Sequence, residues 1–184
     1  GGDLNGNVWR FATSSLSGFS RANTTLLYSA KSATLVATGV YESQPITSRM
    51  AVGYHPTSAV GRIVYFGTGK YYESTDQDPA NAVTYNTMYG IWDRDIADSS
   101  PSSSLITIPS VTTRNSNTLQ QQEILLERSA TFGSNTFDVR TISKNPVTWV
   151  SRNTSGNWNS CSSSGSCGWY LDLESTGEKM VANP

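Results

Sequence analysis

Short runs of β-branched and aromatic residues, separated by Gly, Asn, Ser and Pro, recur along this sequence and restrict its fold more than any other feature. Runs of this kind between turn-forming residues are typical of β-strands. We predict strands at 7–11, 34–36, 46–52, 62–66, 89–92, 136–141 and 168–173. In the last run Trp169, Leu171 and Leu173 share one face, while Tyr170 and Asp172 share the other. This alternation predicts antiparallel strands with one better-buried side.

Helical spacing of apolar residues is clear only over residues 118–128. Even there, Ile124, Leu125 and Leu126 stand between polar residues in a way that also suits a buried strand. The expected class is therefore all-β. With 184 residues, the chain is long enough for one domain that buries its own core.

The charge balance argues against polyanionic partners. Thirteen Lys and Arg residues against fourteen Asp and Glu residues leave a net charge of −1. Such a chain has no long-range field that would attract phosphate backbones, so we expect no nucleic-acid partner. No window approaches the roughly 20 apolar residues that a transmembrane helix needs, so we expect no membrane span. Only 15% of the residues are charged, and Ser and Thr are abundant, which is typical of exported β-rich proteins.

Two stretches interrupt the strand pattern, and we predict loop insertions near 95–110 and 153–167 within a single domain of residues 1–184. The first contains a segment made almost wholly of Ser with one Pro, and the second is mostly Asn, Ser and Gly. Segments of this composition have too little apolar surface to order themselves by burial. Trp158 lies in the second stretch, and we expect its side chain to be exposed and available for a surface contact.

The sequence contains no recognisable catalytic set. His55 is the sole histidine, which excludes a zinc site with two histidines, and no Gly-x-Ser-x-Gly segment presents a nucleophile. The segment 67–70 lacks the spacing of a phosphate-binding loop and fits a strand that ends in a tight glycine turn. We therefore predict no catalytic residues and assign His55 a structural role in a loop.

Two acidic segments are candidates for metal binding. Asp3, Asn5 and Asn7 alternate oxygen ligands around Gly6, as in the first half of a calcium loop, but no later carboxylate completes the set. The favoured alternative is a hairpin turn in which these side chains bond the backbone. The segment 73–78 also alternates acidic residues, but it lacks the glycine that a tight calcium loop requires, so we expect a solvated loop.

Several motifs, in this order and with this approximate spacing, resemble landmarks of the C-terminal β-propeller of PilY-type type IV pilus proteins. They are Gly2–Phe11, Gln44–Thr47, Tyr54–Pro56, Val64–Tyr71, Tyr89–Asp93, Asn145–Trp149, Gly168–Leu173 and Gly177–Lys179. The resemblance extends over nearly the whole chain. It implies a quinoprotein-like β-propeller of which this chain holds an incomplete set of blades, and thus a portion of a larger polypeptide.

The resemblance also implies a non-enzymatic structural and adhesive role in pilus assembly, surface attachment and twitching motility. It implies export to the cell surface or pilus tip through the periplasm, with pilin or minor-pilin subunits and a host or abiotic surface as partners. Calcium is expected in the larger protein but outside this segment, upstream of Gly1. In such an exported protein, Cys161 and Cys167 are expected to form a disulfide at the base of the Trp158 loop.

Two alternative functions follow from the same observations. A quinoprotein-type dehydrogenase would share the propeller fold, but it needs calcium ligands and a catalytic carboxylate that the sequence does not show. A secreted carbohydrate-binding module would use exposed aromatic rings such as that of Trp158 for stacking on sugars.

Overall fold

The computed structural model describes residues 1–11, 24–37, 40–57, 61–78, 85–94, 118–162 and 165–182. Within these ranges the regular structure is β-strand, apart from one short 3-10 turn, η2 (Ser74–Gln77). The predicted all-β class is confirmed. No helix in the described ranges is long and apolar enough to cross a bilayer.

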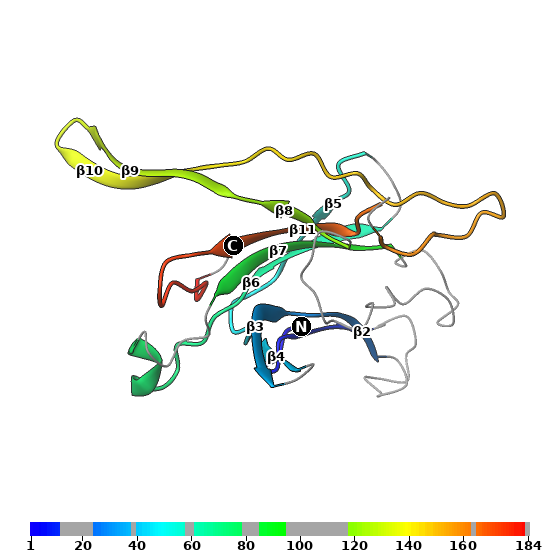
Figure 1. Ribbon diagram of the computed structural model, residues 1–184, viewed down its shortest axis with the longest axis horizontal. Coiled ribbons are helices and arrows are strands. Elements are labelled where there is room, and N and C mark those ends of the chain that lie inside the picture. The colour runs from blue at the N-terminus through cyan, green and yellow to red at the C-terminus, as the bar shows by residue number, and fades with distance from the viewer. Residues whose placement is uncertain are drawn as a thin grey trace.

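The centre of the molecule is a five-stranded sheet with the strand order β5-β6-β7-β11-β8 (Figure 1). Its strands are β5 (Ala51–Tyr54), β6 (Arg62–Gly67), β7 (Asn86–Asp93), β11 (Gly168–Leu173) and β8 (Gln120–Gln122). Neighbouring strands are antiparallel, except that β11 and β8 are parallel. The sheet thus brings together segments that lie far apart in the sequence.

The middle strands of this sheet are covered on both faces, in contrast to the predicted one-sided burial. In β11, Tyr170 and Leu171 point to opposite faces and both are buried. Gly90 in β7 lies opposite Trp169, and a Cβ atom at that position would come within 2.5 Å of the indole nitrogen. Glycine is therefore required there because the Trp169 ring packs directly on the backbone of β7.

Two ribbons form a second layer below the sheet in the view of Figure 1. They pair β1 (Asn7–Phe11) with β2 (Thr24–Ser29) and β3 (Lys31–Ala37) with β4 (Val40–Ser43). Tyr28 of β2 contacts the sheet, with its ring centroid 5.2 Å from that of Tyr89 and 6.3 Å from that of Phe66. One part of the hydrophobic core lies between the two layers, and another part, around Trp92, lies against His55, Trp149 and Trp158.

A buried glutamine joins the layers at one end of the core. Gln44 is fully buried, and its side-chain amide donates hydrogen bonds to the carbonyl oxygen of Tyr85 at 2.6 Å and to Oγ1 of Thr87 at 2.8 Å. The hydroxyl of Tyr89 donates to Oε1 of Gln44 at 2.7 Å. All of these polar groups are satisfied, which is the condition for placing them in a core.

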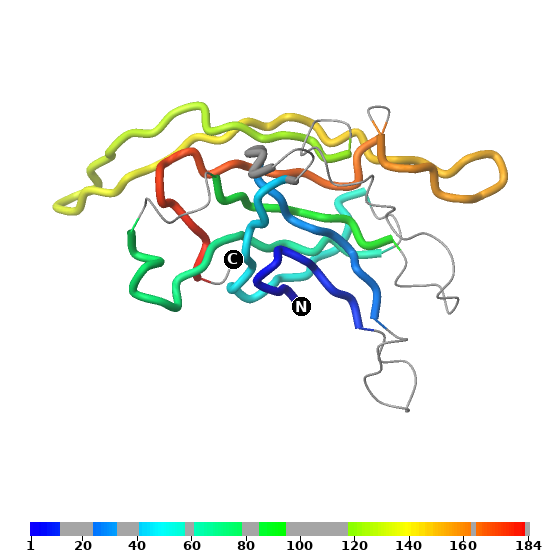
Figure 2. The backbone as a smooth tube through the Cα atoms, turned by 60° about the horizontal axis from the view of Figure 1, so that its bottom comes forward, coloured from blue at the N-terminus to red at the C-terminus, as the bar shows by residue number. Residues whose placement is uncertain are grey.

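Neither prediction for the segment 118–128 is correct. The segment does not form a helix, and the strand that includes Ile124, Leu125 and Leu126 is not buried. Residues 120–122 form β8, and residues 124–132 form β9 (Ile124–Phe132), which pairs with β10 (Asn135–Ile142). This hairpin leaves the body at one end of the molecule, while residues 152–158 project at the other end (Figure 2). Leu125 and Leu126 are exposed because no other described element covers them.

Other predicted strands differ in extent. Within 46–52 only Ala51 and Val52 lie in a strand, and Ile46 makes an isolated bridge with Gly69. The backbone N–H of Ile46 donates to the carbonyl oxygen of Asp3, so this segment pairs with a loop instead of a sheet. Strands β2 and β4 were not predicted. The predicted insertion at 95–110 lies outside the described residues.

Candidate interaction surface

The carboxylate of Asp3 organises the turn before β1. Its Oδ1 accepts hydrogen bonds from the backbone N–H groups of Asn5 and Asn7, both at 2.9 Å. Its Oδ2 accepts from Nδ2 of Asn7 at 3.0 Å and from Nε1 of Trp9 at 2.9 Å. Both oxygens are thus used within the turn, as the hairpin-turn alternative predicts. A calcium ion at Asp3, Asn5 and Asn7 would have to displace these donors.

The protonation of Asp3 reflects this setting. Partial burial by itself raises the pKa of the Asp3 carboxyl group, but the hydrogen bonds from Trp9, Asn7 and Asn5 outweigh it, so the pKa lies below its ordinary value.

In the second acidic segment, residues 73–78, the side chains of Glu73 and Asp76 pair with Nζ of Lys70 at 3.1 Å and 3.4 Å. No group of three or more His, Cys, Asp or Glu side chains that could hold a metal ion occurs among the described residues.

His55 lies in an aromatic cluster and is buried. Its ring centroid is 4.3 Å from that of Trp92 and 4.2 Å from that of Trp149. Nδ1 accepts a hydrogen bond from the backbone N–H of Thr57 at 3.3 Å. Burial lowers the pKa of His55, so the ring is neutral at physiological pH. Two tryptophan rings therefore pack directly against this histidine.

Trp158 is half-buried instead of exposed. Its ring centroid lies 4.9 Å from that of Trp92 in an edge-to-face contact. The guanidinium carbons of Arg152 and Arg94 lie over the ring at 4.4 Å and 5.6 Å from its centroid. These contacts engage the indole within the molecule, so a sugar would have to compete with two cations for its faces.

The segment that contains Trp158 is ordered by local bonds. Oδ1 of Asn153 accepts hydrogen bonds from the backbone N–H groups of Ser155 and Asn157, both at 3.0 Å. The predicted disulfide is present, with the Cα atoms of Cys161 and Cys167 5.6 Å apart. The turn around Asn153 and the disulfide therefore order a segment that has too few apolar residues to be ordered by burial.

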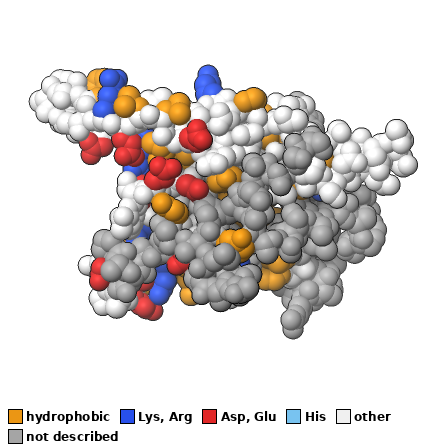
Figure 3. Space-filling view, viewed as in Figure 1, with side chains coloured by type: hydrophobic (Ala, Val, Ile, Leu, Met, Phe, Trp, Pro, Cys, Tyr) orange, Lys and Arg blue, Asp and Glu red, His pale blue; other side chains and the backbone are white. Residues whose placement is uncertain are grey.

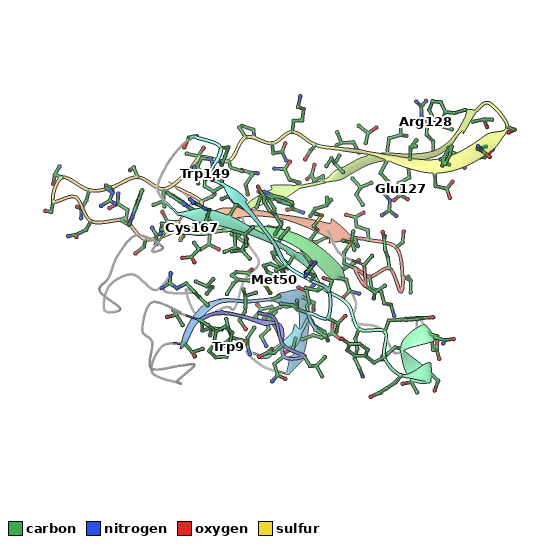
Figure 4. The ribbon with its side chains drawn as sticks, turned by 180° about the vertical axis from the view of Figure 1, so that it is seen from behind. Trp9, Met50, Glu127, Arg128, Trp149 and Cys167 are labelled. Carbon is green, nitrogen blue, oxygen red and sulfur yellow. A yellow bond between two sulfur atoms is a disulfide. The ribbon has the colours of Figure 1, made fainter. Side chains whose placement is uncertain are left out.

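The β9–β10 hairpin has two chemically different faces. Its register places Leu126 opposite Thr141, Arg128 opposite Val139, Ala130 opposite Phe137 and Phe132 opposite Asn135, and all eight side chains lie on one face. We call this set the outer face. The side chains between them belong to the other, inner face. Figure 4 shows Arg128 and Glu127 on opposite sides of the ribbon.

The outer face has large apolar side chains that are open to solvent, beside the polar residues Arg128, Asn135 and Thr141. Phe132 is 65% exposed, Phe137 is 51% exposed and Leu126 is 50% exposed. The rings of Phe132 and Phe137 contact each other across the strands, with centroids 6.2 Å apart. Exposed aromatic side chains that cluster in this way are typical of interaction sites.

The inner face is polar and is tied to the body. Arg140 forms ion pairs with Glu127 of the neighbouring strand and with Glu178 in the segment after β11. Its Nη2 donates to Oε2 of Glu178 at 3.0 Å. Ser129 donates to Asp138 at 2.7 Å on the same face. In Figure 3 acidic side chains gather on the lower side of this projection, and apolar side chains lie along its upper side.

The base of the hairpin is also fixed to the central sheet. Oε1 of Gln122 accepts hydrogen bonds from Oγ of Ser143 at 2.8 Å and from the backbone N–H of Asn145 at 3.0 Å. Nδ2 of Asn145 donates to the carbonyl oxygen of Gln121 at 3.0 Å. Since β8 is itself a strand of the sheet, these bonds hold the projection in a defined direction.

The predicted site residues are thus not brought together. Asp3 and Trp158 belong to separate structural features, and the surface with the strongest interaction chemistry is the outer face, which the sequence analysis did not identify. Its signal was present, because Leu126, Ala130 and Phe132 alternate with polar residues in one strand, as Phe137 and Val139 do in the next.

Comparison with known proteins relates the chain to a single family. The family model described as the PilY1 beta-propeller domain matches residues 1–136. The chain is 35% identical over 191 residues to the type IV pilus biogenesis factor PilY1 of Pseudomonas aeruginosa strain PAO1. This match covers 94% of the chain and 14% of that protein. It is 27% identical to a PilY1 homologue of Xylella fastidiosa strain Temecula1, of which it covers 10%.

A solved structure shows the same relationship. The crystal structure of the Pseudomonas aeruginosa PilY1 C-terminal domain superposes with a TM-score of 0.65 at 31% sequence identity. The match covers 99% of this chain and 37% of that chain. The chain therefore spans only a small part of the relatives that it matches.

Proposed function

The chain belongs to the PilY1 β-propeller family, and from this membership we propose that it is a non-enzymatic structural part of a type IV pilus biogenesis factor. In this role it is exported to the cell surface or pilus tip and supports pilus assembly, surface attachment and twitching motility. Its partners are pilin or minor-pilin subunits and, during attachment, a host or abiotic surface. Calcium acts on the larger protein from outside residues 1–184.

The observation that supports this proposal most directly is the exposed outer face on a firmly anchored hairpin. Phe132 and Phe137 are exposed at the end of a projection whose base is bonded to the central sheet. Binding residues on projecting segments of a rigid frame are typical of recognition domains. The described residues around His55 serve packing and give no support to a catalytic role.

The test is an in-frame deletion of the coding sequence for residues 1–184 in the native gene. We expect loss of surface pili, of attachment and of twitching, while the remaining protein is still exported. Immunoblots of surface fractions provide the export control, and the restored gene provides the complementation control. Normal piliation and twitching in the deletion strain would contradict the proposal, as would a quinone absorbance band after reconstitution with pyrroloquinoline quinone.

A further inference from the structure

We propose that the side chains of Thr87 and Gln44 react with each other to form an intramolecular ester cross-link, with release of ammonia. The inference goes beyond the proposed function and does not rest on it. Both side chains are fully buried among residues that the structure describes, so the inference is independent of what covers the surface of this part of the protein.

The hydroxyl group of Thr87 is placed as a nucleophile. Thr87 lies in β7 directly opposite Asp172 of β11, and its hydroxyl donates a hydrogen bond to Oδ1 of Asp172 at 2.8 Å. A hydroxyl has one proton, so this bond leaves a lone pair of Oγ1 for the side-chain amide of Gln44, whose Nε2 lies 2.8 Å away. A hydroxyl between a base and a carbonyl group is the arrangement of an activated nucleophile.

The side-chain amide of Gln44 is held as the target of this attack. Its Nε2 donates to the carbonyl oxygen of Tyr85 at 2.6 Å, and its Oε1 accepts from the hydroxyl of Tyr89 at 2.7 Å. A backbone carbonyl can only accept, which fixes the orientation of the amide. The electrophilic carbon Cδ is bonded to Nε2 and therefore lies within about 4 Å of Oγ1 of Thr87. Rotation about the soft terminal torsion of Gln44 turns the face of Cδ toward that oxygen.

The reaction needs no external reagent. Oγ1 of Thr87 attacks Cδ of Gln44 while its proton passes to the carboxylate of Asp172, which acts as the general base. The hydroxyl of Tyr89 stabilises the negative charge that forms on Oε1. Asp172 then gives the proton to Nε2, the Cδ–Nε2 bond breaks, and ammonia leaves. The products are one ester bond and one molecule of ammonia, so atoms and charge balance.

Burial favours the ester over hydrolysis. The side chains of Gln44, Thr87 and Tyr89 are all fully buried. Exclusion of water removes the competing nucleophile that would convert the glutamine to glutamate, and it protects the ester once the ester has formed. The attacking hydroxyl of Thr87 therefore has an advantage over solvent.

Backbone hydrogen bonds hold both reacting residues in place. The N–H of Gln44 donates to the carbonyl oxygen of Ala30 at 3.1 Å, and the N–H of Thr87 donates to Oγ1 of Thr68 at 2.8 Å. Reacting groups that are held close together have already lost most of their relative motion, which speeds a reaction between them. The cross-link needs to form only once in the life of each molecule.

The cross-link connects the two layers of the fold covalently. Gln44 follows β4 of the ribbon layer, and Thr87 lies in β7 of the central sheet. With an ester between them, residues 45–86 form a closed loop that a pulling force cannot extend unless a covalent bond breaks. The core would thereby gain mechanical strength that its hydrogen bonds alone do not provide.

The experiment is peptide mapping by mass spectrometry of the full-length protein, purified from its own bacterium and digested with trypsin under mildly acidic conditions that preserve esters. Complete cleavage places Gln44 in the peptide 32–49 and Thr87 in the peptide 71–94. We expect these two peptides as a linked pair with a mass about 17 Da below their sum, since one ammonia is lost. Hydroxylamine should separate the pair, because it cleaves esters in preference to peptide bonds.

Three variants test the assigned roles. Thr87→Val removes the nucleophile at similar side-chain shape and should abolish the linked pair, whereas Thr87→Ser keeps the hydroxyl and should retain it. Asp172→Asn should lower the linked fraction at a fixed time after synthesis by about tenfold or more, because the general base is lost. Only protein that resists limited proteolysis is compared, so that a poorly folded variant is not mistaken for an unreactive one.

Several results would overturn the inference. Separate peptides of unchanged mass from the wild-type protein would show that the four side chains form only a hydrogen-bonded network. A loss of about 17 Da within the peptide 32–49 alone would show that another group attacks Gln44, and a gain of about 1 Da would show hydrolysis. A linked pair that persists in Thr87→Val would place the bond elsewhere. None of these results bears on the role in pilus biogenesis, which the deletion strain tests separately.

Discussion

Single polar side chains fix the loops of this protein where apolar burial is small. Asp3 uses both carboxylate oxygens to hold the turn before β1, and Gln44, in the chain after β4, satisfies polar groups of residues 85–89 inside the core. Hydrogen bonds to a charged acceptor are stronger than those between neutral groups. The stability of the N-terminal turn therefore depends on one ionised group.

We predict that Asp3→Asn lowers the free energy of unfolding by about 2 kcal/mol at neutral pH, because the amide cannot accept the bonds from both Asn7 and Trp9 at Oδ2. The folded pKa of Asp3 lies below the ordinary aspartate value of about 3.9. The contribution of the carboxylate is therefore fully present above that value and is lost as the pH falls through the lower folded pKa.

Urea denaturation at a series of pH values measures this effect. The difference between the wild-type protein and Asp3→Asn should be constant at neutral pH and should shrink in the acid range below about pH 4. Asn5→Ala is the matched control, because it changes the same turn while keeping the backbone N–H that bonds Asp3. A difference that persists unchanged into the acid range would refute the role of the Asp3 charge.

At the scale of elements, the β9–β10 hairpin shows how ion pairs can orient a ribbon. A two-stranded ribbon alone is marginally stable in water, so its position depends on what it contacts. Arg140 links β10 to β9 through Glu127 and to the C-terminal segment through Glu178. The inner face is thereby held toward the body, and the outer face is kept available.

We predict that Arg140→Ala speeds hydrogen exchange of the β9–β10 backbone amides several-fold while changing the global free energy of unfolding by less than about 1 kcal/mol, since partly exposed ion pairs contribute little to global stability. Arg128→Ala is the matched control, because it removes the same side chain from the opposite face. Equal exchange rates in the two variants would show that the ion pairs do not position the hairpin.

For the whole molecule, the decisive feature is the core shared by the central sheet and the layer of two ribbons. Tyr28 belongs to the ribbon layer, and its ring contacts Phe66 and Tyr89 of the sheet. Arg10 of β1 also pairs with Asp93 at the end of β7 at 2.7 Å. The two layers should therefore unfold together and not as independent units.

We predict that Tyr28→Ala lowers the free energy of unfolding by about 3 to 4 kcal/mol, as expected for removing a buried aromatic ring. Hydrogen exchange should report the loss equally in β2 and in β7, because both contribute to the same core. Tyr28→Phe, which keeps the ring, is the control. Protection lost in β2 but retained in β7 would show that the layers are separate units.

Much of the strand pattern could be predicted from the sequence. The runs at 7–11, 62–66 and 168–173 coincide with strands β1, β6 and β11, because alternation and turn residues specify them locally. The helix alternative at 118–128 failed, since residues 120–122 pair with the distant strand β11 and residues 124–128 pair with the next strand, β10. The half-buried position of Trp158 also depended on contacts that are remote in sequence.

The sequence by itself determined the all-β class, the turn around Asp3 and the proximity of Cys161 and Cys167, since each depends on residues within a few positions of one another. Only the tertiary structure decided which faces are covered. Alternation places Leu126 and Phe132 on one side of a strand, but whether that side meets the core or solvent depends on what packs there. In this protein Arg140 and Glu178 hold the polar side inward, so the large apolar side chains of the other side are exposed.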